Sequence, residues 1–306
     1  MRRLPLLTVR DLAGFAGIAA LLPAAIFAGE GGWTSYCRLL GRVLVGLGVD
    51  ASSRGRSVPP GLGADLAATN LEGMLLLLRK LRPGRWRPRV ETAGREHLDE
   101  ALESGRGAIL LVHLFQPTLH LFAFPAAGYE VVRLSAETHG YFRQSRIGLD
   151  VLNPWLLKLE SDGRIERIIS RPGSIAHLRP LARRLARNRP VVFRSIGSGF
   201  SVETATTVTA PFLGAKLDLS TTPFSLALES STPLLPAIPV AVGPGRFRLT
   251  IESPVAPPAE GLRAERVAAM VRETVRRLEP WVRAYPGQWT DWRRVVSAAV
   301  PTPHHA

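Results

Sequence analysis

The sequence predicts an α/β fold in which a mostly parallel central sheet is flanked by helices, with an apolar helical anchor at the N-terminus. Short apolar runs such as Ala108–Val112 and Pro190–Arg194 are typical of strands buried on both faces. Segments with helical periodicity alternate with these runs, and Gly and Pro residues separate the two. This alternation indicates strands that are joined by crossover helices.

The elements of the α/β domain follow in order. Leu71, Met74, Leu75 and Leu78 lie on one face of a predicted helix. The pattern predicts helices over residues 65–81, 95–104, 175–188, from 221 and over 267–282, and strands over residues 108–112, 129–134, 190–194, 233–240 and 246–251. The prolines of residues 233–240 favour a strand suited to a sheet edge, because proline cannot donate to the ladder. Residues 246–251 alternate as an antiparallel strand does.

The N-terminal part of the chain differs from the rest. Residues 12–29 carry no charge and are close to the shortest length that spans a bilayer, but they include Pro23. Arginines lie on both sides of this run, so they do not set an orientation. A signal peptide and a buried helical hairpin are alternatives, and an interfacial or re-entrant anchor fits better than a clean span. We therefore predict a membrane-anchor region over residues 1–50, a linker over 51–64, an α/β domain over 65–296 and a tail over 297–306.

Composition limits the possible partners and cofactors. The chain has 306 residues and a formal net charge of +14, which favours anionic lipid surfaces or nucleic acid. The tryptophans near arginines lie mostly on elements that also look structural, so we do not expect nucleic-acid binding. Cys37 is the single cysteine, which excludes internal disulfides and cysteine-based zinc sites. The histidines show no metal-binding spacing, and there is no P-loop or G-x-S-x-G motif. No metal or cofactor is expected.

His113 follows directly on the buried strand 108–112, and Pro117 suits the first turn of a helix. This order places His113 at the carboxyl end of a parallel strand, where open α/β sheets hold their chemistry. A histidine that simply closes a strand is the structural alternative. Position alone does not decide between the two.

Four blocks of residues, taken together, resemble those of a known family. They occur in order over roughly residues 90–295, and each is weak alone. The blocks are Gly105-Arg106-Gly107 before the strand that ends in His113, Pro211-Phe-Leu-Gly214 with Thr221-Thr-Pro, Pro233-Leu-Leu-Pro236, and Pro286-Gly-Gln-Trp289 with Trp292-Arg293-Arg294. On these blocks the chain resembles the bacterial lipid A biosynthesis acyltransferases of the lauroyl/myristoyl type, within the lysophospholipid acyltransferase superfamily.

The resemblance implies a glycerolipid acyltransferase-like fold and a membrane-associated acyltransferase. Such an enzyme moves a fatty acyl chain from acyl carrier protein or coenzyme A to a lipid or glycolipid acceptor, with no further cofactor. It implies the cytoplasmic (inner) membrane, with the catalytic domain facing the cytoplasm. His113 matches the general base of that family. Gln116 and Thr118 are expected to line the same strand end, and Arg143, Arg146 and Arg194 to bind phosphate.

The sequence departs from the family at the residue that pairs with the histidine. The family has Asp or Glu five positions after it, and this chain has Thr118, which has a hydroxyl and no negative charge. His120 should face away from the site on the following helix. Glu130 and Glu137 are alternative carboxylates on the next strand and its loop. The alternative function is therefore a catalytically silent or strongly diverged relative that binds anionic lipid or a partner at the membrane.

Overall fold

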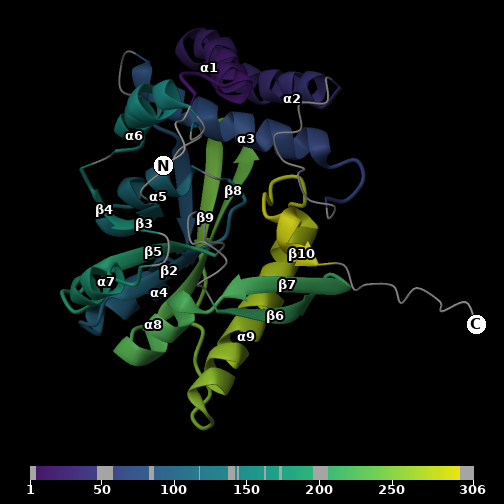
Figure 1. Cartoon of the computed structure of the whole chain (residues 1–306). Coiled ribbons are helices and arrows are strands. Elements are labelled where there is room, and N and C mark those ends of the chain that lie inside the picture. The colour runs from purple at the N-terminus through teal and green to yellow at the C-terminus, as the bar shows by residue number, and fades with distance from the viewer. Residues whose placement is uncertain are drawn as a thin grey trace, which may run out of the picture.

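The computed structural model describes residues 5–46, 58–82, 86–116, 118–136, 142, 145–161, 163–171, 174–195 and 206–296 (Figure 1). A seven-stranded sheet lies at its centre in the order β1-β9-β8-β2-β5-β3-β4. The strands are β1 Arg89–Ala93, β2 Ala108–Val112, β3 Val131–Ala136, β4 Ile165–Ser170, β5 Pro190–Arg194, β8 Leu234–Gly243 and β9 Arg246–Ile251. All neighbours pair in parallel except β8 and β9. The predicted α/β fold with a mostly parallel sheet is confirmed.

Both faces of the sheet are covered, as the continuous apolar sequence of β2 requires. Leu110 and Val112 face a core formed with α3 Gly63–Leu78, α4 Arg95–Glu103, α5 His120–Ala126 and α6 Asn153–Glu160. Ile109 and Leu111 face the opposite core. That core is formed with α7 Leu178–Leu185, α8 Thr222–Ser230, α9 Arg263–Ala284 and a small antiparallel sheet of β6 Thr207–Phe212, β7 Ala215–Ser220 and β10 Val295–Val296.

The prediction that residues 233–240 suit a sheet edge is wrong, because β8 lies between β9 and β2. Each of its two prolines lies where a neighbouring strand has ended. The carbonyl of Pro236 accepts a hydrogen bond from Glu252, one residue beyond the end of β9. Ala237 accepts from His113 and is the last residue paired with β2, so Pro239 faces the same side beyond that pairing. The missing N–H groups therefore leave the interior ladders intact.

Most other predicted elements lie close to the observed ones. The predicted strands over residues 108–112 and 190–194 coincide with β2 and β5, and the predicted C-terminal helix lies within α9. The helix predicted over residues 175–188 is shorter, since α7 spans Leu178–Leu185. The helix expected to begin at Pro117 begins only at His120, and Pro117 itself lies outside the described residues.

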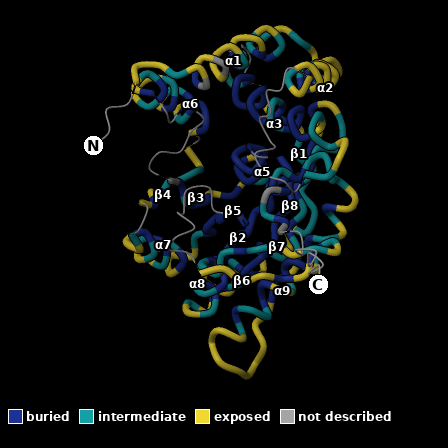
Figure 2. The backbone as a smooth tube through the Cα atoms, turned by 45° about the vertical axis from the view of Figure 1, so that its right-hand side comes forward, coloured by how far each residue is buried: buried dark blue, intermediate teal, exposed yellow. Residues whose placement is uncertain are grey.

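The N-terminal segment forms a hairpin of α1 Val9–Phe27 and α2 Glu30–Gly46 that packs on α3 (Figures 1 and 2). Within the described parts of the chain, no helix is long and apolar enough to cross a membrane. The prediction of an apolar anchor helix is corrected to a packed hairpin, because this segment forms two helices that contact α3. Gly41 allows the close approach of α2, because a Cβ there would lie 2.9 Å from the carbonyl oxygen of Ala64.

The buried side chain of Arg79, which follows α3, contacts the hairpin of α1 and α2. The guanidinium of Arg79 lies 4.7 Å from the ring centroid of Trp33 and 4.8 Å from that of Trp86. Its Nη1 also donates to the carbonyl oxygen of Ala28, 3.0 Å away, just after the end of α1. Cation–π contacts and a bond to carbonyls at a helix end both favour a positive charge there. This contact fixes where α1 ends and α2 begins.

Candidate active site

His113 lies at the carboxyl edge of the parallel strands, directly after β2. Its backbone N–H donates to the carbonyl oxygen of Ala237 in β8 at 2.9 Å. On the other side, the N–H of Ser195 donates to the carbonyl oxygen of Val112 at 2.8 Å. The carboxyl ends of β2 and β5 thus meet around this residue beside the middle of β8, where an open α/β sheet commonly holds its site.

The imidazole of His113 is buried, with 1% of the residue exposed. Neither ring nitrogen has a hydrogen-bond partner among the described residues. Burial lowers the pKa of His113 from 6.5 to about 3, because the charged ring would lose its hydration. His113 is therefore neutral at physiological pH. No described carboxylate orients the ring or offsets a positive charge on it.

The two polar residues that follow His113 contact α3 instead of the ring. Gln116 Nε2 donates to a carboxylate oxygen of Glu72 at 3.0 Å. The hydroxyl of Thr118 donates to the carbonyl oxygen of Gly73 at 2.8 Å. Both side chains are buried. These bonds hold the turn after β2 against α3. One of them engages the hydroxyl of Thr118, which stands at the position where the resemblance expects Asp or Glu.

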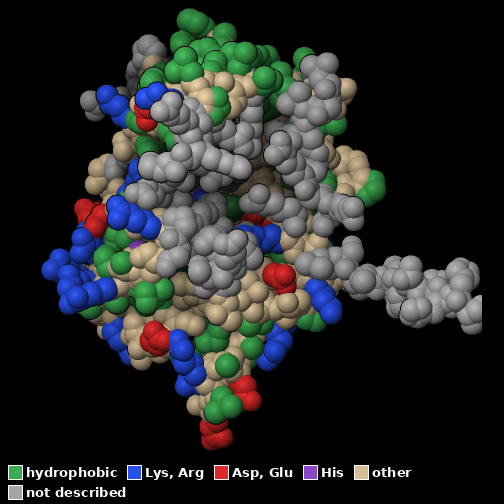
Figure 3. Space-filling model, viewed as in Figure 1, with side chains coloured by type: hydrophobic (Ala, Val, Ile, Leu, Met, Phe, Trp, Pro, Cys, Tyr) green, Lys and Arg blue, Asp and Glu red, His purple; other side chains and the backbone are tan. Residues whose placement is uncertain are grey.

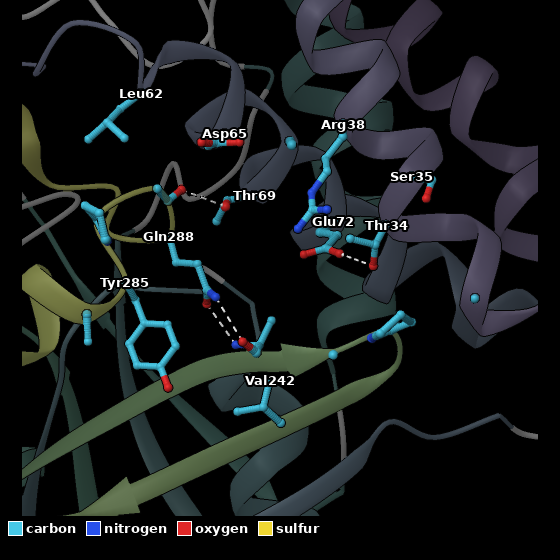
Figure 4. Close-up of a pocket in the computed structure, with 18 residues that line it drawn as sticks. Thr34, Ser35, Arg38, Leu62, Asp65, Thr69, Glu72, Val242, Tyr285 and Gln288 are labelled. Carbon is cyan, nitrogen blue, oxygen red and sulfur yellow. Dashed lines mark hydrogen bonds between the residues drawn. The ribbon is translucent and has the colours of Figure 1, made fainter.

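A pocket of about 530 Å³ lies beside this turn, between α2, α3, the end of β8 and the loop after α9 (Figure 4). Glu72 lines it and accepts hydrogen bonds from Gln116 and, at 2.8 Å, from the hydroxyl of Thr34. Arg38 and Glu72 point toward one another from α2 and α3 (Figure 4). The other polar residues that line the pocket are Ser35, Asp65, Thr69, Tyr285 and Gln288.

The pKa of the Glu72 carboxyl is raised above 4.5, chiefly by burial. The hydrogen bonds from Thr34 and Gln116 and the charge of Arg38 act in the opposite direction and offset only part of that effect. Glu72 is not among the site residues predicted from the sequence. The pattern that could have indicated it is a single carboxylate within the apolar run of residues 71–78, on a helix whose other side chains there form the core.

We expect Glu72→Gln to be more stable than the wild type at neutral pH and equally stable below about pH 4.5. A raised carboxyl pKa means that the folded state binds the proton more tightly, so wild-type stability falls as pH rises above 4.5 through the raised pKa. The slope for one proton is at most about 1.4 kcal/mol per pH unit. A glutamine can accept from Gln116 and donate to Thr34, so the local bonds remain.

Urea unfolding of both proteins between pH 4 and pH 8 measures this difference. Glu100→Gln on the exposed surface of α4 is the matched control and should follow the wild type at every pH. A Glu72→Gln curve parallel to that of the wild type would show that the carboxyl titrates normally.

The structure separates the other predicted site residues. Arg194, the last residue of β5, is half-buried at the same sheet edge as His113. Arg146 is exposed, and its N–H donates to the carbonyl oxygen of Pro5 near the start of the chain. Glu130 forms an ion pair with Arg189 at the amino end of β3, which is the opposite edge of the sheet. It cannot supply the missing carboxylate.

Arg143 and Glu137 lie outside the described residues. His120 is buried in α5, in keeping with a packed helix residue. Burial raises the pKa of the Cys37 thiol to about 12, so this side chain is not a thiolate nucleophile at neutral pH. No group of three metal-ligating side chains occurs among the described residues. The substrate-binding roles of Gln116, Thr118, Arg146 and Arg194 stay predictions.

The start of the closing sequence block, residues 286–288, forms a wall of the pocket. The side-chain amide of Gln288 pairs with both backbone groups of Ala241, at 2.8 and 2.9 Å, in the part of β8 that extends beyond its pairing with β2. Thr69 donates to the carbonyl oxygen of Gly287, and Thr290 donates to that of Leu114. This block therefore connects β8 and α3 with the turn that holds His113.

Comparisons with known proteins add little to this geometry. No protein-family model matches the chain, and no curated protein matches it. Among solved structures, it is similar to the 1-acyl-sn-glycerophosphate (LPA) acyltransferase PlsC from Thermotoga maritima. The two share 12% sequence identity with a TM-score of 0.38, over 90% of this chain and 100% of that one. A likeness of that size transfers no function to this chain.

Proposed function

We propose that this protein is a membrane-associated acyltransferase that moves a fatty acyl chain from an acyl thioester to a lipid or glycolipid acceptor. The observation that carries the proposal is a neutral histidine with two unpartnered ring nitrogens at the carboxyl edge of a parallel sheet. The four sequence blocks that resemble lipid A-type acyltransferases support it, and one of them, the segment after α9, contacts the turn that carries His113.

The proposed chemistry needs one base. The imidazole of His113 takes the proton of the acceptor hydroxyl as its oxygen attacks the thioester carbonyl carbon. The tetrahedral intermediate then collapses, the C–S bond breaks, and the leaving sulfur takes the proton back from the imidazolium. The thioester of acyl carrier protein or coenzyme A is a co-substrate, and the step uses no other cofactor. Without a carboxylate partner the imidazolium is less stabilised than in a His–carboxylate pair.

The exposed faces of α1 and α2 support membrane association. The exposed large apolar side chains of these helices include Leu12, Phe15, Phe27, Leu39 and Val43. Figure 3 shows hydrophobic side chains gathered at the top of the molecule, where these helices lie. The net charge of +14 would add attraction to anionic headgroups. A helical hairpin that lies in the membrane interface fits these features. We place the protein on the cytoplasmic face of the cytoplasmic membrane, where acyl thioesters are made.

The double change Phe15→Asp with Leu39→Asp should weaken binding to anionic vesicles at least about tenfold, because two apolar side chains would no longer enter the interface. Vesicle co-sedimentation of the full chain measures it. Ile175→Asp with Leu262→Asp removes two apolar residues elsewhere that are more exposed than Phe15 and Leu39, and it should leave binding unchanged. Equal loss in both double variants would exclude the hairpin as the membrane contact.

The proposal is tested by mass spectrometry of lipids from cells with and without the gene. The expected result is an acylated species that disappears without the gene. Purified protein, a labelled acyl thioester and a lipid extract should then regenerate it. Absence of any such species, with no transfer in vitro, would overturn the proposal.

A second candidate function is a catalytically silent relative that binds anionic lipid. The observation that favours it is the burial of His113 without an orienting partner in the part of the chain that the structure describes. It predicts vesicle binding without turnover, and binding that does not change when His113 is replaced.

A further inference from the structure

The pocket beside the His113 turn has an unusual charge for this protein. Arg38, Asp65 and Glu72 are the charged side chains among the described residues that line it. The chain as a whole has a net charge of +14, yet this pocket holds two carboxyl groups against one guanidinium. A phosphate in the pocket would meet the carboxylates at close range. The lining therefore disfavours the anionic group that the overall charge would suggest.

The two carboxyl groups of the pocket keep free hydrogen-bond acceptors, beside the donors of Arg38, Ser35 and Tyr285. Each oxygen of Glu72 accepts one hydrogen bond, from Thr34 and from Gln116, and a carboxylate oxygen can accept about two. Asp65 is exposed and accepts no hydrogen bond from a described residue. Gln288 and Thr69 are already engaged with backbone carbonyl groups. A ligand that donates hydrogen bonds would satisfy Glu72 and Asp65 together.

The place of the pocket suits an amphiphile. Gly31, Thr34, Ser35 and Arg38 of α2 line it, while Leu39 and Val43 of the same helix are exposed apolar residues. A molecule with its chain at the apolar face of α2 can thus place its head in the pocket. Glu72 of the pocket accepts a hydrogen bond from Gln116 in the turn that carries His113, so the pocket adjoins this turn.

We propose that this pocket binds the head of an amphiphilic acceptor, and that this head donates hydrogen bonds through hydroxyl or ammonium groups and carries no phosphate in the pocket. Glu72 and Asp65 accept those hydrogen bonds, and Arg38 keeps the Glu72 carboxyl oriented toward the pocket. That the ligand is the acyl acceptor rests on the proposed function. The preference for a donor head does not.

Three amphiphiles with the same chain test the preference: octyl glucoside, octylammonium and octyl phosphate. Each is titrated below its micelle concentration into the full-length protein at pH 7.5, and binding is followed by calorimetry and backbone amide shifts. Because all three molecules carry the same octyl chain, any binding of that chain to the apolar faces of α1 and α2 contributes equally to the three affinities. We expect octyl glucoside or octylammonium to bind at least tenfold more tightly than octyl phosphate, with shifts in α2, α3 and the loop after α9.

Variants locate the effect. Glu72→Gln with Asp65→Asn should lower the affinity for the preferred head at least tenfold, while Glu100→Gln with Glu229→Gln on the surface should leave it unchanged. Arg38→Gln and Arg42→Gln remove one arginine each from α2, inside and outside the pocket. Neither should weaken octyl phosphate binding, since the pocket is not built for phosphate. Preference for the glucoside would indicate a polyol head, and preference for octylammonium an amine.

Two outcomes would overturn the inference. One is that octyl phosphate binds as tightly as the other two and loses its affinity in Arg38→Gln. The other is that the carboxyl variants leave the preference unchanged. Because no turnover is measured, a failed acyl transfer assay with the expected binding would overturn only the proposed function.

Discussion

Replacing His113 by alanine should lower acyl transfer from a thioester by roughly 10²–10⁴-fold, which is the usual contribution of a general base. No other described histidine stands at the carboxyl end of β2, and no carboxylate of a described residue bonds to the His113 ring. The remaining turnover would come from substrate placement alone. Release of free thiol with transfer of labelled acyl chain to lipid measures the rate. His97→Ala, on α4 at the surface side of the domain, is the matched control and should keep the wild-type rate.

A folding readout separates loss of the base from loss of structure. The pKa of His113 lies at about 3 in the folded protein, below its usual 6.5, so the unfolded chain binds a proton first as pH falls. Wild-type stability should therefore decrease between pH 6.5 and pH 3, by several kcal/mol for this residue. His113→Gln should lack that part of the decrease. A folded His113→Gln variant with unchanged transfer would exclude His113 as the base.

The second large effect concerns a buried ion pair between β3 and α6. Glu160→Gln should lower the free energy of unfolding by about 3–5 kcal/mol, because Arg133 would remain buried without its partner. The two side chains lie 2.7 Å apart and are 6% and 5% exposed. Arg167 lies close enough for the charge of Glu160 to act on it as well. Urea unfolding followed by circular dichroism measures the loss.

Two comparisons show whether burial is the cause. Glu91→Gln breaks the exposed pair with Arg248, at 3.2 Å, and should cost less than about 1 kcal/mol. Joint replacement of Arg133 and Glu160 by Met and Leu should restore most of the stability that Glu160→Gln loses. If Glu160→Gln and Glu91→Gln lower the free energy of unfolding by the same amount, burial does not make the Arg133–Glu160 pair more important for stability than an exposed pair.

Local patterns predicted much of the fold. β2 and β5 were predicted with their observed bounds, because each is a short apolar run that follows a glycine or begins at a proline. The helix predicted over residues 95–104 nearly coincides with α4, and the one predicted over 267–282 lies within α9. The error over β8 has a different origin. Whether a proline disturbs a sheet depends on where the neighbouring strands end, and the sequence of β8 does not contain that information.

The site was predicted only in part. His113, Gln116 and Thr118 were expected at one strand end, and they do follow β2. The resemblance expects a carboxylate at the position of Thr118, and Thr118→Glu would place one there. The structure argues against it, because the Thr118 hydroxyl donates to the carbonyl oxygen of Gly73 in a buried contact. A glutamate there would set a negative charge beside that oxygen, away from any contact with His113.

The sequence by itself determined that His113 ends a strand buried on both faces, since that follows from five consecutive apolar residues and the glycine before them. Only the tertiary structure decided which carboxylate joins the site. Glu72 reaches Gln116 across 44 residues of sequence, and the hairpin of α1 and α2 places Thr34 and Arg38 beside it. Such contacts depend on how helices pack on the sheet, whereas periodicity records only which face of each helix is apolar.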